Sequence, residues 1–105
     1  MKIENTALTE AVYYILLSVY MPLHGYGIMQ NVEALSKGRV HLAAGTLYGA
    51  LNTMLEKGWI RALPEESKSR KKEYVITELG KTVAKNELKR LQELVSNGKK
   101  ILEVE

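Results

Sequence analysis

Apolar side chains recur at helical spacing in three early segments of the chain. In residues 7–21 they occur at nearly every turn, and a proline ends the run. Residues 25–37 and 43–57 carry the same pattern, and each segment is followed by a glycine, which commonly ends a helix. The pattern predicts three helices. The first is apolar on more than one side, so we expect it to be buried against a second surface as well.

The pattern changes after the third helix. Residues 59–63 and 71–77 favour short strands, and the polar segment 64–70 between them is typical of an exposed loop. Thr77 can then cap a final helix. Its apolar positions approximate a heptad seam, formed by Leu88, Leu91, Val95 and Leu102, with Gly98 at one inner position. We predict that this seam dimerises the protein, and packing within one subunit is the alternative.

Three helices, a hairpin and a long last helix predict a mainly α protein with a small β-hairpin, arranged as a winged helix-turn-helix. Residues 1–77 would form the DNA-binding part and residues 78–105 the C-terminal dimerisation helix, together one compact domain. The chain has 105 residues, 46% hydrophobic and 26% charged, which fits a single globular domain. In such a fold the third helix lies in the DNA major groove.

Several classes of protein are excluded by residues that the sequence lacks. Without cysteine there is no disulfide framework and no thiolate zinc site. His24 and His41 have no partners at ligand spacing, so we expect no metal or other cofactor, and no nucleophile beside a base supports an enzyme. The apolar run 11–23 is shorter than the ~20 residues that span a bilayer, and the start is unlike a signal peptide. We therefore expect a cytoplasmic protein with no membrane partner.

The net charge is only +3, but the basic residues are concentrated in one place. Four of them lie in the predicted loop and the strand after it: Lys68, Arg70, Lys71 and Lys72. Such a cluster is an electrostatic footprint for phosphates, and a solvated loop tip is the alternative. Arg70 is the candidate for insertion in the minor groove. Lys37 and Arg39 are candidates for contact with the DNA backbone beside it.

The outward face of the third predicted helix is small, polar and neutral. Near its start, Ala44, Gly45 and Thr46 would let the helix backbone approach DNA closely. Tyr48 could donate its hydroxyl to a phosphate, and Asn52 is the candidate for reading a base edge, since adenine is the usual partner of asparagine. The alternatives are a tyrosine that packs on a neighbouring helix and a solvated asparagine. Because this face lacks lysine and arginine, we expect the wing to provide much of the phosphate attraction.

Four short motifs follow one another along the chain. They are His24-Gly-Tyr-Gly-Ile28, Gly45-Thr-Leu-Tyr-Gly-Ala-Leu51, Glu56-Lys-Gly-Trp-Ile60 and Tyr74-Val-Ile-Thr-Glu-Leu-Gly80. In order and spacing they resemble the PadR family of bacterial transcriptional regulators, across roughly residues 8–80. The resemblance implies a winged helix-turn-helix repressor that binds a palindromic operator as a homodimer, through its first and last helices. The single C-terminal helix is similar to that of the short branch of the family.

The chain also departs from the family pattern. Members commonly carry proline after the motif tyrosine and a basic residue further along the recognition helix. This chain has Gly49 and the pair Asn52-Thr53 at those places. Direct readout by a bidentate arginine of this helix is therefore not expected.

Some members of the family bind flat aromatic compounds between two subunits, which implies a candidate effector for this chain. The residues that would line such a space are Tyr13, Tyr14, Tyr20 and Met21. Packing in the core or in the dimer is the simpler alternative. We predict a sequence-specific DNA-binding regulator, a homodimeric repressor on pseudo-palindromic double-stranded DNA, with release by a small aromatic effector left open. The alternative is a dimeric ligand-sensing or protein-interaction module that has the winged-helix fold but binds DNA weakly.

Overall fold

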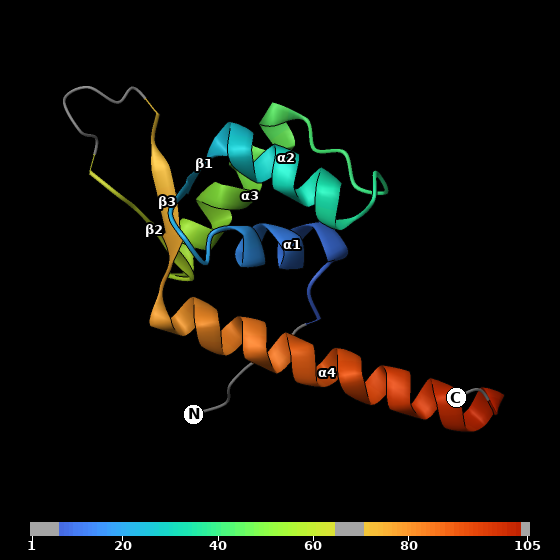
Figure 1. Ribbon diagram of the computed structural model, residues 1–105. Coiled ribbons are helices and arrows are strands. Elements are labelled where there is room, and N and C mark those ends of the chain that lie inside the picture. Colours follow the sequence, from blue (N-terminus) through green and yellow to red (C-terminus); the bar gives the residue numbers. More distant parts are fainter. Residues whose placement is uncertain (1–6, 65–70, 104–105) are drawn as a thin grey trace.

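The computed structural model describes residues 7–64 and 71–103. In chain order the elements are α1 (Glu10–Ser18), β1 (Leu23–His24), α2 (Gly25–Leu35), α3 (Ala44–Glu56), β2 (Ile60–Ala62), β3 (Glu73–Ile76) and α4 (Glu78–Leu102). The first three helices pack together beside a small sheet, and α4 runs along the other side of α1 (Figure 1). The predicted winged helix-turn-helix is thereby confirmed.

The sheet has three strands in the order β1-β3-β2, both pairs antiparallel, whereas the sequence predicted a two-stranded hairpin. The extra strand, β1, pairs Leu23 with Tyr74 and His24 with Glu73. A strand of two residues is too short to produce an alternating pattern, which is why the sequence did not reveal it. Its consequence is that the start of α2 is fixed directly to the sheet.

Helix α1 is shorter than predicted at both ends. Thr9 caps its start, because its side-chain oxygen accepts a hydrogen bond from the Val12 amide at 3.1 Å. At the other end, the Val19 carbonyl accepts a hydrogen bond from the Ile76 amide at 2.8 Å. This bond to β3 draws the chain out of the helix after Ser18. A long-range contact therefore ends a helix that apolar periodicity alone extended to residue 21.

The core joins α1, α2 and α3 to the inner side of the sheet. Its buried hydrophobic residues are Ile15, Leu16, Val19, Ile28, Val32, Leu47, Leu51, Met54, Ile60, Tyr74, Ile76 and Ala84. The members from α2 and α3 follow the helical spacing predicted from the sequence. Since full burial of one such large aliphatic side chain contributes about 1.5–3 kcal/mol, this face of α3 is fixed inward and the opposite face is held outward.

The end of β3 joins α4 through Thr77. Its hydroxyl oxygen accepts a hydrogen bond from the Gly80 amide at 3.0 Å and donates one to the Gly58 carbonyl at 2.6 Å. The predicted cap is confirmed. A Cβ on Gly80 would lie 2.7 Å from Cγ1 of Ile76 and closer still to the Trp59 carbonyl oxygen, so only glycine lets α4 begin here. These contacts explain why the fourth motif ends with a glycine, Gly80.

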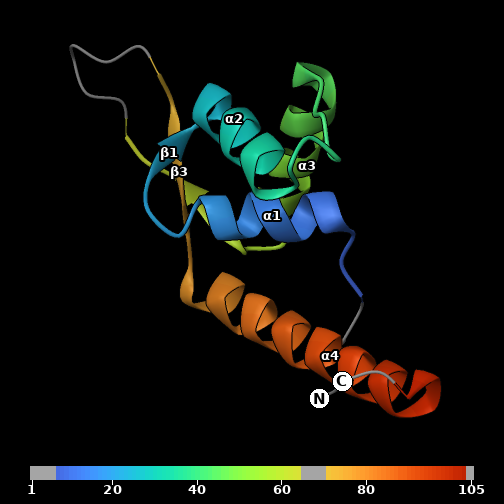
Figure 2. The ribbon, with the colours of Figure 1, turned by 45° about the vertical axis from the view of Figure 1, so that its right-hand side comes forward.

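Helix α4 has two unlike halves. The buried residues Gly80, Ala84 and Glu87 all belong to the first half, which packs under α1. In both views the second half extends past α1, away from the sheet (Figures 1 and 2). It exposes the large apolar side chains Leu94, Val95, Ile101 and Leu102. Among the described residues, no helix combines the length and the apolar character needed to cross a bilayer.

Candidate nucleic-acid interface

The outward face of α3 carries the residues that the sequence singled out. Ala44, Gly45, Thr46, Tyr48 and Asn52 are all exposed. Their position follows from the burial of Leu47, Leu51 and Met54 on the other side. No lysine or arginine lies between residues 44 and 56, so this face is neutral except for Glu56. It can approach DNA closely, but it adds little electrostatic attraction.

Tyr48 joins two motifs that are far apart in the sequence. A Cβ on Gly25 would lie 2.9 Å from Cζ of the Tyr48 ring and closer still to its hydroxyl oxygen, so the ring lies against the first residue of α2. Tyr48 as a whole is nevertheless 45% exposed. His24, the N-cap residue of α2, makes no side-chain capping hydrogen bond. The first amides of α2, close to the Tyr48 hydroxyl, therefore lack a side-chain cap. Tyr48 thus packs on α2 while part of the residue stays exposed.

The wing is described only at its base. Lys68 and Arg70 lie outside the described residues, while Lys71 and Lys72 are exposed just before β3. Arg61 on β2 is a further exposed cation, paired in register with Val75. Arg61 was not among the residues predicted from the sequence. Its signal was the apolar Ile60 before it, since the next side chain along a strand points to the opposite face.

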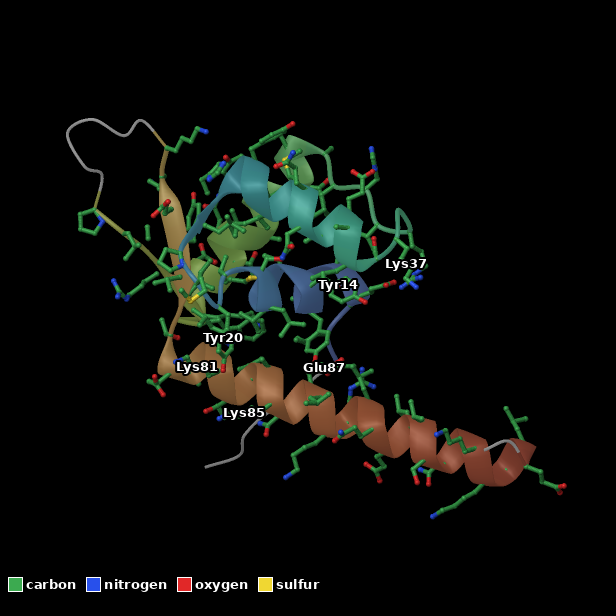
Figure 3. The ribbon with its side chains drawn as sticks, viewed as in Figure 1. Tyr14, Tyr20, Lys37, Lys81, Lys85 and Glu87 are labelled. Atoms are coloured by element: carbon green, nitrogen blue, oxygen red, sulfur yellow. The ribbon has the colours of Figure 1, made fainter. Side chains whose placement is uncertain are left out.

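The structure corrects the expected place of Lys37 and Arg39. Both lie at the connection from α2 to α3, which is at the far side of the helical bundle from β2 and β3 (Figures 1 and 2). They are therefore not beside the wing. Lys37 is exposed at the end of α2, where it adopts a left-handed backbone with φ 54° (Figure 3).

Arg39 is engaged by a carboxylate of α1. Its guanidinium donates hydrogen bonds to both carboxylate oxygens of Glu10, with Nε 3.2 Å from Oε1 and 3.0 Å from Oε2. Nη2 also contacts Glu10. The hydrogen bonds from Arg39 lower the pKa of Glu10, which keeps the pair ionised. The charge of Arg39 is therefore already partly balanced by Glu10.

The chain matches the model of the Transcriptional regulator PadR-like family over residues 14–86. It belongs to the PadR-like family. The matched region includes α2, α3, the wing strands and the start of α4. The four motifs that suggested this family therefore fall in the helix-turn-helix, the wing and their connection to α4.

Solved structures of other PadR proteins share this architecture. A PadR family transcription regulator from Clostridium difficile is 20% identical, with 90% of this chain and 99% of that chain covered and a TM-score of 0.76. A PadR family transcriptional regulator from Eggerthella lenta is 21% identical, with 90% and 82% covered and a TM-score of 0.71. PadR of Bacillus subtilis in complex with operator DNA is 26% identical, with 73% and 45% covered and a TM-score of 0.60. No curated protein sequence matches the chain.

The four residues predicted to line an effector site have different surroundings in this PadR protein. The rings of Tyr13 and Tyr14 stack at 6.2 Å between centroids. The Tyr20 ring lies 5.4 Å from Nζ of Lys81 on α4 (Figure 3). Met21 is 73% exposed. These side chains border the junction with α4 or the solvent, and their role toward an effector stays a prediction.

A groove of about 1070 Å³ lies elsewhere, between the start of α1, the end of α3 and the first half of α4. Its apolar lining includes Leu8, Val12, Met54, Trp59, Leu79 and Val83. Trp59 borders the groove, and Nζ of Lys57 lies 5.2 Å from the centre of its ring. None of the four predicted effector residues lines it. Within residues 7–64 and 71–103, no cluster of histidine and carboxylate side chains could hold a metal ion.

Glu87 is a buried carboxylate that the sequence argument missed. Its oxygens accept hydrogen bonds from Arg90 at 2.9 and 2.6 Å and from the Leu8 amide at 3.4 Å. The hydrogen bonds from Arg90 lower the pKa of Glu87, so this buried group stays ionised. Figure 3 shows Glu87 pointing from α4 toward α1. It therefore ties the segment before α1 to the middle of α4.

Proposed function

We propose that this PadR protein is a sequence-specific regulator that binds double-stranded DNA, acts as a repressor and works as a homodimer on a pseudo-palindromic operator. The observation that carries the proposal is the exposed outward face of α3, together with the exposed cations Arg61, Lys71 and Lys72 of the wing. It is supported by the resemblance to Bacillus subtilis PadR in complex with operator DNA, at 26% identity.

In this proposal α3 lies in the major groove, where Asn52 bonds to a base edge. Ala44, Gly45 and Thr46 let the start of the helix come close to the DNA. The Tyr48 hydroxyl and the first amides of α2 meet one phosphate, because helix N-termini attract anions. The wing adds the charge through Arg61, Lys71 and Lys72, together with the predicted contacts of Lys68 and Arg70.

The proposed dimer joins the last helices of two subunits. Along the predicted seam, Leu88, Val95 and Leu102 are 46%, 55% and 73% exposed, and Leu91 is half-buried. A second subunit related by two-fold symmetry would cover these side chains and place two α3 helices about 34–36 Å apart, one turn of DNA. We keep the division into residues 1–77 and 78–105 in this functional sense, although the first half of α4 belongs to the packed core.

Release by a small aromatic effector remains part of the proposal, with Tyr13, Tyr14, Tyr20 and Met21 as candidate residues near the dimer interface. Because the proposed partner is chromosomal DNA, we place the protein in the cytoplasm, with no catalytic role. The second candidate function is a dimeric ligand-sensing or protein-interaction module with weak DNA binding. The observation that favours this second function is the neutral face of α3, which gives little electrostatic attraction to DNA.

A gel-shift series separates the two functions. The labelled probe is the DNA upstream of the protein's own gene, titrated at several salt concentrations. We expect retardation at low salt that weakens steeply as salt rises, since each phosphate contact releases counterions. Asn52→Ala should reduce binding, and Gln92→Ala on α4 is the matched control. A protein that sediments as a dimer but retards no DNA at low salt would favour the second function.

A further inference from the structure

The buried side of α4 continues beyond the part of the helix that α1 covers. Its buried residues, Gly80, Ala84 and Glu87, are spaced three and four residues apart. The same spacing continues through the second half of the helix, where the side chains are half-buried or exposed: Leu91, Leu94, Val95, Ile101 and Leu102. Within the described residues, the second half of α4 therefore carries an apolar side that its own subunit leaves largely uncovered.

The groove between α1, α3 and α4 is a second apolar surface without a cover. It has a volume of about 1070 Å³, and its lining includes Val12, Met54, Val83 and Trp59. An exposed apolar helix side and an exposed apolar groove each gain stability by leaving water. Because one chain carries both, two copies of this chain can supply both partners.

The two surfaces have the same length along α4. The groove follows α4 from Leu79 to Glu93, and the exposed apolar side chains run from Leu88 to Leu102. At 1.5 Å per residue, each stretch is about 21 Å long. If two α4 helices lie antiparallel about a two-fold axis near Arg90, the exposed stretch of each follows the groove of the other, in a reciprocal contact.

A parallel pair of α4 helices would bury less apolar surface. The two exposed stretches would then cover each other, and both grooves would stay open to water. In the antiparallel pair both stretches and both grooves are covered. Since the hydrophobic contribution grows with the apolar area removed from water, the antiparallel pair is favoured.

We propose that the second half of α4 from a second copy of this chain fills the groove, so that the two subunits exchange their last helices in an antiparallel pair. This inference rests on the homodimer of the proposed function and names the surface that joins it. The groove also includes Thr53 and Met54 of α3. The second copy of α4 therefore contacts the last turns of the recognition helix, and dimerisation fixes the orientation of that helix.

Cross-linking tests this arrangement, because the chain has no cysteine of its own. One variant carries Thr82→Cys in the groove, and a second, affinity-tagged variant carries Ile101→Cys, at a position 79% exposed in one subunit. The two are produced together and treated with a short thiol-to-thiol cross-linker. We expect a covalent dimer with one copy of each variant. Ile101→Cys alone should give none, since its two copies would lie at opposite ends of the pair.

Lys99→Cys is the matched control for the end of α4. It lies two residues before Ile101, on nearly the opposite side of the helix, and should cross-link to Thr82→Cys far more slowly than Ile101→Cys does. In a protein that sediments as a dimer, cross-linking of Ile101→Cys to itself, or no cross-link between Ile101→Cys and Thr82→Cys, would overturn the inference and leave the proposed function standing. A protein that sediments as a monomer would instead contradict the proposed homodimer.

Trp59, the single tryptophan of the chain, reports on the groove without a cysteine. Dilution of the wild-type dimer into monomers should shift its fluorescence to longer wavelength and increase its quenching by acrylamide, because water enters the groove. Leu102→Glu should show both changes at concentrations where the wild type is a dimer, and Gln92→Glu should show neither. The inference is wrong if Trp59 fluoresces alike in dimer and monomer, or if the apolar dye anilinonaphthalene sulfonate quenches it in the dimer, since the groove would then be open.

Discussion

The phenol ring of Tyr48 covers the first residue of α2, where a Cβ on Gly25 would lie 2.9 Å from the ring carbon Cζ. Gly25→Ala should therefore displace the ring. Because Tyr48 is 45% exposed, the ring has room to move outward. We expect the free energy of unfolding to fall by about 1 kcal/mol, at the low end of the cost of overpacking. Thermal unfolding of the variant and the wild type would measure this loss.

DNA affinity should fall in the same variant, since the displaced hydroxyl no longer lies beside the first amides of α2. Tyr48→Phe removes only the hydroxyl and isolates its contribution. In the double variant Gly25→Ala/Tyr48→Phe the two losses of affinity should not add, because both remove the same contact. Fully additive losses would mean that Gly25 affects DNA binding by another route.

Glu87→Gln should destabilise the fold through the contact between α4 and the start of α1. We expect a loss of about 1–3 kcal/mol at pH 7, because Arg90 would lose a charged hydrogen-bond partner in a buried place. The pKa of Glu87 is lowered in the fold from 4.5. Its contribution is therefore fully present above pH 4.5 and is lost as the pH falls through the folded pKa.

Urea unfolding at pH 7 and at pH 3 would test this dependence. The difference between wild type and Glu87→Gln should shrink at the lower pH. Glu93→Gln, an exposed position on the same helix, is the matched control and should change little at either pH. An equal difference at both values of pH would assign the loss to the shape of the side chain rather than its charge.

Arg39→Ala should change DNA binding less than Lys72→Ala. Both side chains are exposed cations, but the Arg39 guanidinium is hydrogen-bonded to Glu10, whereas Lys72 lies at the base of the wing. We expect the slope of affinity against salt concentration to flatten by about one ion in Lys72→Ala and to stay unchanged in Arg39→Ala. If the slope flattens by the same amount in both variants, Arg39 contacts a phosphate as well.

Charges on the α4 seam should separate the proposed dimer without unfolding the subunit. Val95→Glu and Leu102→Glu replace side chains that are 55% and 73% exposed in one subunit. Sedimentation of these variants should give a monomer with unchanged helix content, and Gln92→Glu should remain dimeric. If the charged variants keep the wild-type molecular mass, another surface joins the subunits.

Local patterns along the sequence predicted the elements whose stability comes from one apolar face. The observed ends of α3 lie within one residue of the prediction, because its buried residues repeat at helical spacing. Distances between segments were not accessible in this way. The contact of Tyr48 with Gly25 and the pair of Arg39 with Glu10 join residues far apart in the chain. Neither leaves a periodic signal, so the packing of Tyr48 and the engagement of Arg39 could be found only in three dimensions.

The bonds of Thr77 have a mechanical consequence. One hydroxyl group binds the Gly58 carbonyl, where α3 gives way to the wing, and also receives the first turn of α4. The end of α3 and the start of α4 are therefore held together through Thr77, so that a change in the orientation of one helix is transmitted to the other. In the proposed dimer, a ligand or partner that tilts one α4 against the other would change the spacing of the two α3 helices without touching either of them.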